Sequence, residues 1–443
     1  MHGGLWRRTW RHDRLALAVL GVGSLIATIA YRAITRPMAD TVTYRATAHV
    51  LRDGWPTITE RGPGYPILLI LTGSTSSSTH LLWFVQLGIH LLTAILVIDV
   101  ARSAGVGRHG RAAIALLLIA PASWLRVVYE GTEILAALLV TLAFWLVLRR
   151  PDPRHRLRWA LALGAISGAA GLVRPNLAML FLPMAVVVWA QLRSDRPAAW
   201  RSAAAVALAA VVLIGGYSAI NGIRFDSFGL TPLAPYHLNA KTAPYVEELP
   251  SLFEPARTIL IEERDAALLR GESSAPDNYI WRARPRLEAA TGLHGRELDR
   301  YVMRIDVELI TNNPFAYLDT VKTASVNYTN LDSQPAILGL GRPAAWAQQA
   351  AHLVLLALFV ATVGLVPGLA LAGRVARRAL EPYLVAVLLA ATTMAGVVLT
   401  ETGTARLRGP TEPVLALLLV LSASIVRRRG ASDAAPLGAS EPT

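Results

Sequence analysis

Two residue types that could move a proton stand close together early in the chain. Asp40 is followed four residues later by Tyr44, so a helix through PMADTVTYRATAHVLRDGWP would carry both on one face. An aspartate that faces a substrate can take the proton of a hydroxyl group as a general base. The alternative is that Asp40 only caps the start of this helix, because Asp is a favoured N-cap residue.

The stretch ERGPGYP, from Glu60 to Pro66, offers a candidate anion site. Its glycines let the backbone bend and its prolines stiffen the turn, so Arg61 would be held in one place. A planar guanidinium can bind two phosphate oxygens, which makes Arg61 a candidate ligand of a lipid phosphate. Arg61 could instead pair with Glu60 or contact ordinary anionic headgroups. The apolar ILLILTG behind it is too short to span a membrane and is expected at the interface.

More charged residues stand next to apolar runs. Glu130 and Glu133, in VVYEGTEIL, lead into such a run, where a carboxylate is costly unless it faces a polar cavity. We expect one of the two to be functional, although acids also favour the start of a helix. Arg174, in GLVRPN, could bind an anion or extend to the membrane surface. Arg406 and Arg408, in RLRGPTEP, are candidates for phosphate binding.

His237 and Lys241, in PYHLNAK, are weaker candidates, because lone residues of these types in a connecting segment are usually solvated. No motif such as H-E-x-x-H predicts a metal site, and we expect no obligatory metal. Asp40, Glu60 and Glu130 could still offer oxygen ligands to a divalent cation. The chain has no cysteine, which excludes disulfides, thiolate metal sites and a cysteine nucleophile.

The composition indicates that a membrane positions these residues. Hydrophobic residues make up 53% of the chain, charged residues 16%, and the mean hydropathy is +0.43. The net charge of +13 comes largely from arginines at the ends of apolar runs, so it reflects membrane topology and not a nucleic-acid partner. Ten runs approach the roughly 20 residues that a membrane helix needs. They cover residues 15–34, 79–101, 112–128, 131–148, 157–173, 176–192, 202–220, 347–372, 382–400 and 411–426.

The arginines also predict the orientation of the chain. Basic residues gather in alternate connections, which is typical of the cytoplasmic side. These connections lie near residues 102–111, 149–158, 193–201, 374–378 and 427–429. Both termini are therefore expected in the cytoplasm. The outer connections are then residues 35–78, 121–130, 174–176, 221–346 and 401–410, and the candidate residues lie in or beside them.

We therefore predict an all-α polytopic membrane protein with about ten transmembrane helices, interfacial helices on the outer face and a small helical external domain. The predicted parts are an N-terminal transmembrane module (1–220) with the first outer loop 35–78, an external segment (221–346), C-terminal transmembrane helices (347–429) and a disordered cytoplasmic tail (430–443). In the external segment, Leu298, Tyr301, Val302, Ile305 and Leu309 have the spacing of an amphipathic helix.

In this order along the chain, the motifs resemble those of the GT-C glycosyltransferases, which use polyprenyl-phosphate sugars as donors. The most similar branch contains protein O-mannosyltransferases, the lipid A aminoarabinose transferase and RgtA/B/C/D-like domains. The resemblance rests on Asp40 with Tyr44, ERGPGYP, Pro121 with Glu133, GLVRPN and RLRGPTEP.

The resemblance implies an inverting transfer of one sugar on the outer face of a bacterial plasma membrane. Asp40 would be the catalytic base, Arg61 would neutralise the donor phosphate, and Arg406, Arg408 and Arg174 would assist. Tyr44, Glu60, Glu130, Glu133, His237 and Lys241 would support the sugar or the acceptor. The partners would be membrane lipids, a polyprenyl-phosphate sugar and a saccharide, lipid, protein or small-molecule acceptor. The donor sugar, mannose or arabinose for example, and the acceptor stay open.

Two other functions would use the same arginines. A transporter or flippase of a lipid-linked sugar also binds phosphate, but it is expected to have polar or broken helices at membrane depth. A membrane polysaccharide polymerase or ligase would differ in using a long lipid-linked glycan. The apolar spans and the charges on one face favour a one-sided transferase site.

Overall fold

A computed structural model describes residues 13–271, 279–330 and 342–433. These residues form α-helices and short 3-10 helices with no β-strand, and one isolated bridge pairs Arg36 with Tyr129. The predicted all-α class is confirmed. The predicted tail 430–443 lies outside the described residues from residue 434 onward.

Residues 13–225, as the structure describes them, contribute ten α-helices. They are α2 (Arg14–Ala30), α3 (Thr41–Arg52), α4 (Gly64–Leu71), α5 (His80–Ser103), α6 (Arg108–Leu118), α7 (Pro121–Val128), α8 (Glu133–Val147), α9 (Arg156–Val173), α10 (Phe181–Leu192) and α11 (Arg196–Phe225). The eight-residue α4 has the sequence GYPILLIL and so contains most of the ILLILTG segment, and its length agrees with the expectation that this segment does not span a membrane.

The remaining helices follow in the second half. They are α12 (Ala234–Thr242), α13 (Ala256–Leu269), α14 (Tyr279–Thr291), α15 (Arg296–Asn312), α16 (Pro314–Thr329), α18 (Arg342–Leu371), α19 (Arg377–Thr400) and α20 (Glu412–Asp433). Short 3-10 helices connect several of them, among which η3 (Ala243–Glu248) follows α12 and η5 (Ala405–Thr411) precedes α20.

Six stretches of the described chain are long and apolar enough to cross a membrane. They are His80–Ser103, Pro175–Leu192, Arg196–Phe225, Gln349–Leu371, Arg377–Thr400 and Arg406–Arg427, and the shorter apolar helices Arg14–Ala30 and Glu133–Val147 add to them. The run 112–128 was predicted to be one helix, and this prediction is wrong. The structure has α6 followed by α7 in this region. The break precedes Pro121, and a proline disfavours helical geometry in the residue before it. A multi-pass membrane protein is supported, and the count of ten spans stays a prediction.

Ion pairs join connections that were assigned to the cytoplasmic side. Arg102 and Arg111 both contact Asp13, and Arg149 contacts Asp99. Arg150 pairs with Glu381, and Arg156 pairs with Asp195, at 3.0 and 3.1 Å. Connections on the same side of a helix bundle can contact one another. The contacts among these basic connections therefore agree with the prediction that they lie on one side.

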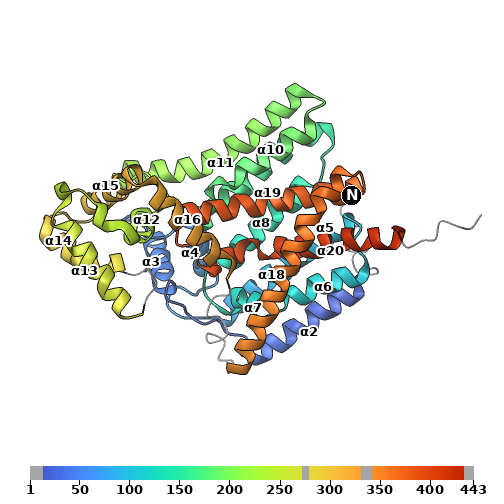
Figure 1. The fold of residues 1–443 in the computed structure, drawn as a ribbon, viewed down its shortest axis with the longest axis horizontal. Helices are drawn as coiled ribbons and strands as arrows, with labels where there is room; N and C mark the ends of the chain where they lie inside the picture. Colours follow the sequence, from blue (N-terminus) through green and yellow to red (C-terminus); the bar gives the residue numbers. More distant parts are fainter. Residues whose placement is uncertain (1–12, 272–278, 331–341, 434–443) are drawn as a thin grey trace, which may run out of the picture.

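The segment between α11 and α18 packs around a hydrophobic cluster of its own. Leu298, Val302, Ile305 and Leu309 are buried on one face of α15, as their spacing predicted, and pack with residues of α12, α13 and α14. Figure 1 shows these helices together at one end of the elongated molecule, near α3 and α4. The long helices α5, α19 and α20 extend toward the opposite end (Figure 1). That this segment is an external domain remains a prediction.

Candidate functional site

The carboxylate of Asp40 lies between two arginines. Arg61 Nη2 is 2.9 Å from Oδ1, and Arg406 Nη1 is 2.7 Å from Oδ2. Asp40 is the residue before α3, but its side chain makes no capping hydrogen bond. The interpretation of Asp40 as a simple helix cap is therefore wrong. The side chain keeps 28% of its surface exposed, so an incoming group can reach it.

Arg61 is held by the face of α3 that carries Asp40. Its Nε donates to Thr43 Oγ1 at 2.9 Å, and its guanidinium carbon lies 5.2 Å from the centre of the Tyr44 ring. Asp40, Thr43 and Tyr44 occupy positions three and four apart, which face the same way on a helix. The side chain of Glu60 is exposed and makes no ion pair with any described residue, so the alternative pairing of Arg61 with Glu60 is not observed.

Arg406 connects Asp40 to a second carboxylate. Its Nε donates to Glu133 Oε1 at 2.5 Å, and Arg174 Nη1 lies 3.3 Å from the same oxygen. The five residues Asp40, Arg61, Glu133, Arg174 and Arg406 form what we call the Asp40 cluster. They come from the predicted first outer loop (35–78), the start of α8, the end of α9 and η5. Three guanidinium groups and two carboxylates leave the cluster with one surplus positive charge.

Two glycines let ERGPGYP approach the end of α9. A Cβ on Gly62 would lie 2.3 Å from the carbonyl oxygen of Leu172, and a Cβ on Gly64 would lie 2.4 Å from Val173 Cγ2. Neither distance is compatible with a side chain, so only glycine permits this contact. The glycines were expected to allow bending, and the backbone does bend in this stretch, while the glycines also permit close packing. The contact brings ERGPGYP, which carries Arg61, next to the end of α9, which carries Arg174. The two motifs are far apart in sequence.

The surroundings of Asp40 determine its ionisation. Burial by itself would raise the pKa of the Asp40 carboxyl, but Arg406 and Arg61 hold the pKa below its ordinary value of 3.8. Asp40 is therefore a carboxylate at neutral pH and can accept a proton. Burial raises the pKa of the Tyr44 phenol, which keeps this side chain neutral beside the cluster.

Glu130 and Glu133 have different surroundings although they are three residues apart. The side chain of Glu130 is fully buried and accepts hydrogen bonds from Thr35 at 3.0 Å and from Arg45 Nη2 at 2.8 and 3.0 Å. Ser78 also donates to Glu130. Glu130 thus ties the first outer loop to α7 and α8, whereas Glu133 belongs to the Asp40 cluster.

Arg408 lies outside the Asp40 cluster, and its role as a phosphate ligand stays a prediction. It donates to the carbonyl oxygens of Tyr328 and Asn330, at the end of α16, and its Nε lies 3.7 Å from Glu412. Carbonyl groups at a helix end lack helical partners and favour a cation. Glu412 also accepts from Arg126 at 2.6 Å. Arg408 therefore connects η5 to α16.

His237 and Lys241 lie on α12, away from the Asp40 cluster. His237 is half-buried. Lys241 is buried, and its Nζ donates to the carbonyl oxygen of Val398 at 2.7 Å, at the end of α19. The expectation of a solvated lysine is wrong. Burial lowers the pKa of Lys241 to about 8.

The possible oxygen ligands for a divalent cation do not converge. Across residues 13–271, 279–330 and 342–433, no group of three or more His, Asp or Glu side chains could hold a metal ion. Glu130 is paired with Arg45, and Asp40 is paired with Arg61. The exposed Glu60 shares no ion-pair partner with either of them among the described residues.

Two contributors to the site were missed by the sequence analysis. Thr43 orients Arg61, and Arg45 neutralises Glu130. Arg45 had a usable signal, because it is a basic residue in a connection predicted to be outside, where basic residues are unexpected. Thr43 had none beyond its position one turn after Asp40.

No protein-family model matches the chain, and no curated protein matches it. One solved structure is similar: the crystal structure of ArnT from Cupriavidus metallidurans bound to undecaprenyl phosphate. The two sequences are 16% identical, the match covers 96% of this chain and 80% of that chain, and the TM-score is 0.39.

Proposed function

We propose that this chain is an integral-membrane inverting glycosyltransferase that moves one sugar from a polyprenyl-phosphate donor to an acceptor hydroxyl on the outer face of the membrane. The observation that carries the proposal is the Asp40 carboxylate between Arg61 and Arg406. A general base next to phosphate-binding cations is the pair of functions that such a transfer requires.

The proposed reaction uses each group once. Asp40 takes the proton of the acceptor hydroxyl, and the hydroxyl oxygen forms a bond to the anomeric carbon of the donor. The bond between this carbon and the phosphate oxygen breaks, and its electron pair leaves with the polyprenyl phosphate. Because each oxygen of Asp40 has more than one lone pair, Asp40 can accept this proton and still accept hydrogen bonds from Arg61 and Arg406, although the neutral carboxyl no longer forms ion pairs with them.

The arginines of the cluster would stabilise the leaving phosphate. Nε and Nη2 of Arg61 have protein partners, and its Nη1 has none among the described residues. Arg174 Nη1 is buried and lies 3.3 Å from Glu133 Oε1, but it makes no hydrogen bond to any residue that the structure describes. Donors without a hydrogen-bond partner next to a surplus positive charge suit a phosphate that gains negative charge in the transition state.

Radiolabelled transfer tests the proposal. Purified protein is incubated with polyprenyl-phosphate sugars and candidate acceptors, and product formation is compared among variants. We expect Asp40→Asn to lower the rate by roughly 10²–10⁴-fold and Arg61→Ala by roughly 10²–10³-fold. The matched controls are Asp53→Asn and Arg52→Ala, since these exposed residues at the other end of α3 pair only with their neighbours.

Three results would contradict the proposal. Undiminished transfer by Asp40→Asn would remove the base assignment. Movement of intact donor between leaflets, with no glycosidic product from any acceptor, would support a flippase instead. Use of a long lipid-linked glycan and not a single sugar would support a polymerase or ligase.

A further inference from the structure

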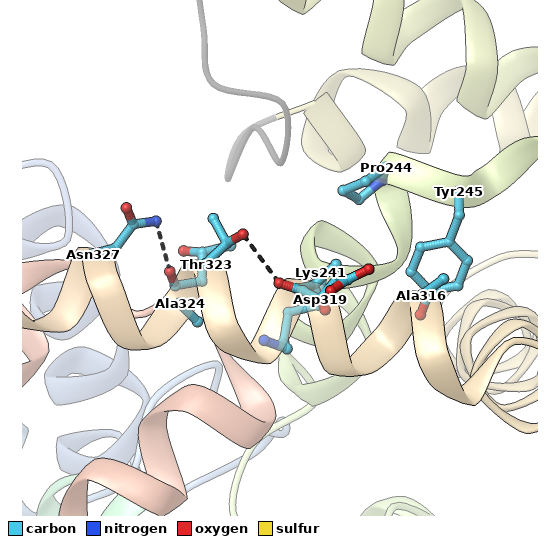
Figure 2. Close-up of a pocket in the computed structure, with 10 residues that line it drawn as sticks. Lys241, Pro244, Tyr245, Ala316, Asp319, Thr323, Ala324 and Asn327 are labelled. Atoms are coloured by element: carbon cyan, nitrogen blue, oxygen red, sulfur yellow. Dashed lines mark hydrogen bonds between the residues drawn. The ribbon is translucent and has the colours of Figure 1, made fainter.

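A pocket of about 260 Å³ with both polar and apolar lining lies between α12, η3 and α16, apart from the Asp40 cluster. Its lining includes Lys241, Tyr245, Asp319, Thr323, Asn327 and Thr402. Figure 2 shows the α16 residues on successive turns of one helix face, with Pro244 and Tyr245 opposite. The volume is slightly below the roughly 300–1,000 Å³ of pockets for drug-sized ligands, so it suits a group such as one sugar ring.

Most hydrogen-bonding groups that line this pocket can accept hydrogen bonds from a ligand. The carboxylate of Asp319 makes no ion pair among the described residues. Asn327 uses its Nδ2 to donate to Thr402 O at 3.2 Å, which leaves its Oδ1 to accept. Thr323 donates its own proton to Asp319 O at 3.0 Å, so its oxygen can accept as well (Figure 2).

Two donors complete the set. The hydroxyl of Tyr245 is buried and makes no hydrogen bond in the part of the chain that the structure describes. A buried polar group without a partner is costly, so a ligand that accepts from Tyr245 would be favoured. Lys241 directs its ammonium group to Val398 O and Glu401 O, at 2.7 and 3.4 Å, and retains one of its three donors.

The charges of the pocket disfavour an anion. Lys241 is already engaged by two carbonyl oxygens, and Asp319 would repel a phosphate or a carboxylate. A ligand with several hydroxyl groups can donate to the acceptors and accept from Tyr245, and the ring of Tyr245 offers an apolar face. Neutral saccharides have this chemistry.

The pocket is connected to the Asp40 cluster through one short connection. Thr402 lies four residues before Arg406, so their Cα atoms are separated by at most about 14 Å. Asn327 contacts Thr402, and Arg408 contacts the end of α16, so the same helix contacts both ends of this connection. A saccharide held at α16 would therefore be near the residues that act on the donor.

We propose that this pocket binds a neutral saccharide unit of the acceptor. This assignment rests on the proposed transferase function and adds the chemical class of the acceptor. The acceptor then carries at least one sugar ring, which α16 holds while a hydroxyl group of the acceptor reaches Asp40.

Binding of simple glycosides tests the pocket without the donor. Full-length protein in nanodiscs is titrated with methyl glycosides of mannose, galactose, glucose and arabinose and with their disaccharides, and binding is followed by saturation-transfer NMR. We expect at least one probe to bind, and Tyr245→Phe, Asp319→Asn and Thr323→Val to weaken it by about 3- to 10-fold each. Ser325→Ala, on α16 but outside the pocket lining, is the matched control and should bind like wild type.

The outcomes separate this proposal from the proposed function. Asp40→Asn should lose transfer and keep glycoside binding. If Asp40→Asn keeps transfer but the pocket variants weaken glycoside binding, the saccharide pocket stands and the transferase mechanism fails. The saccharide proposal is overturned if no probe binds, if the pocket variants bind like wild type, or if glucose 6-phosphate binds in preference to the neutral glycosides.

Discussion

Two glutamates near the start of α8 should respond differently to the same change. Glu130→Gln removes the charge that balances Arg45, and Glu133→Gln removes one that balances Arg174 and Arg406. Breaking a buried ion pair costs roughly 3–5 kcal/mol, and less here because 19% of Arg45 is exposed. We expect Glu130→Gln to lower the thermal unfolding temperature. Glu133→Gln should change donor binding or turnover more than stability.

Thermal unfolding and transfer assays on the two variants measure this difference. The uncharged Gln keeps the size of each side chain, so a change in packing volume does not explain the result. Equal losses of stability and activity in both variants would contradict the separation of Glu130 from the Asp40 cluster.

A buried carboxyl on α15 should make stability depend on pH. Asp306 is fully buried, its Oδ1 accepts from Asn239 at 2.7 Å and Thr242 at 2.9 Å, and its Oδ2 has no hydrogen-bond partner among the described residues. Burial raises the pKa of Asp306 well above its ordinary value of 3.8. The folded state therefore holds this proton to higher pH than the unfolded state does. Its contribution to stability decreases as the pH rises above about 4.

Asp306→Asn should remove this dependence. Asn keeps an oxygen for Asn239 and Thr242 and cannot ionise. We expect the difference in unfolding temperature, variant minus wild type, to increase as the pH rises from 4 to 8. Asp53→Asn, at an exposed carboxylate, should show no such increase and is the control. A difference that stays constant across this range would refute the raised pKa.

Residue types and their positions in the sequence predicted four of the five residues of the Asp40 cluster as catalytic or phosphate-binding. For the fifth, Glu133, the prediction was that either it or Glu130 is functional. Their pairing was not predictable, because Arg406 and Arg408 are equivalent in RLRGPTEP and only the fold turns one to Asp40 and the other to α16. The same limit applies to Lys241, whose burial depends on packing between α12 and α19.

At the scale of elements, the contact between ERGPGYP and the end of α9 should depend on glycine. Gly62→Ala would bring a methyl group against the backbone oxygen of Leu172, which cannot move like a side chain. We expect this change to displace Arg61, to reduce transfer at least tenfold and to lower thermal stability by roughly 1–3 kcal/mol. Gly88→Ala is the control, since a Cβ at Gly88 in α5 meets nothing within 4 Å.

Transfer assays and thermal unfolding distinguish the two glycines. Gly88→Ala should leave transfer unchanged and stabilise slightly, because alanine favours a helix over glycine by roughly 0.5–1 kcal/mol. A Gly62→Ala variant with wild-type activity and stability would show that the motif does not need this approach.

Elements with strong periodicity were predictable, and those that depend on local breaks were not. The apolar face of α15 followed directly from its spacing. The division of 112–128 into α6 and α7 was missed, because hydropathy continues through the break at Pro121. The connection carrying Arg406 was recognised by its charges, but its 3-10 conformation was not.

At the scale of the molecule, the absence of cysteine makes orientation testable. Asp53→Cys and His155→Cys place single thiols at exposed positions in predicted outer and inner connections. On intact cells, a membrane-impermeant maleimide should label position 53, and position 155 only after permeabilisation. Neither substitution removes a lysine or an arginine, so the topology signals are retained. The reverse labelling would overturn the proposed outward-facing site.

The overall arrangement was predictable because charge and hydropathy alternate along the whole chain. The alternation anticipated that Asp40, Glu133, Arg174 and Arg406 would meet at one end of the bundle. It contained no information on the pocket beside α16, whose lining of apolar, polar and charged residues is brought together only by the packing of segments far apart in sequence (Figure 2).

The surplus positive charge of the Asp40 cluster has a consequence for turnover. A phosphodiester donor carries one negative charge, which the cluster matches. After transfer, the released phosphomonoester approaches two negative charges, and Asp40 has gained a proton, so the cluster offers two positive charges. The product complex is then as neutral as the substrate complex. Departure of the spent lipid carrier would therefore wait for Asp40 to return its proton to water, and the enzyme would reset by proton release.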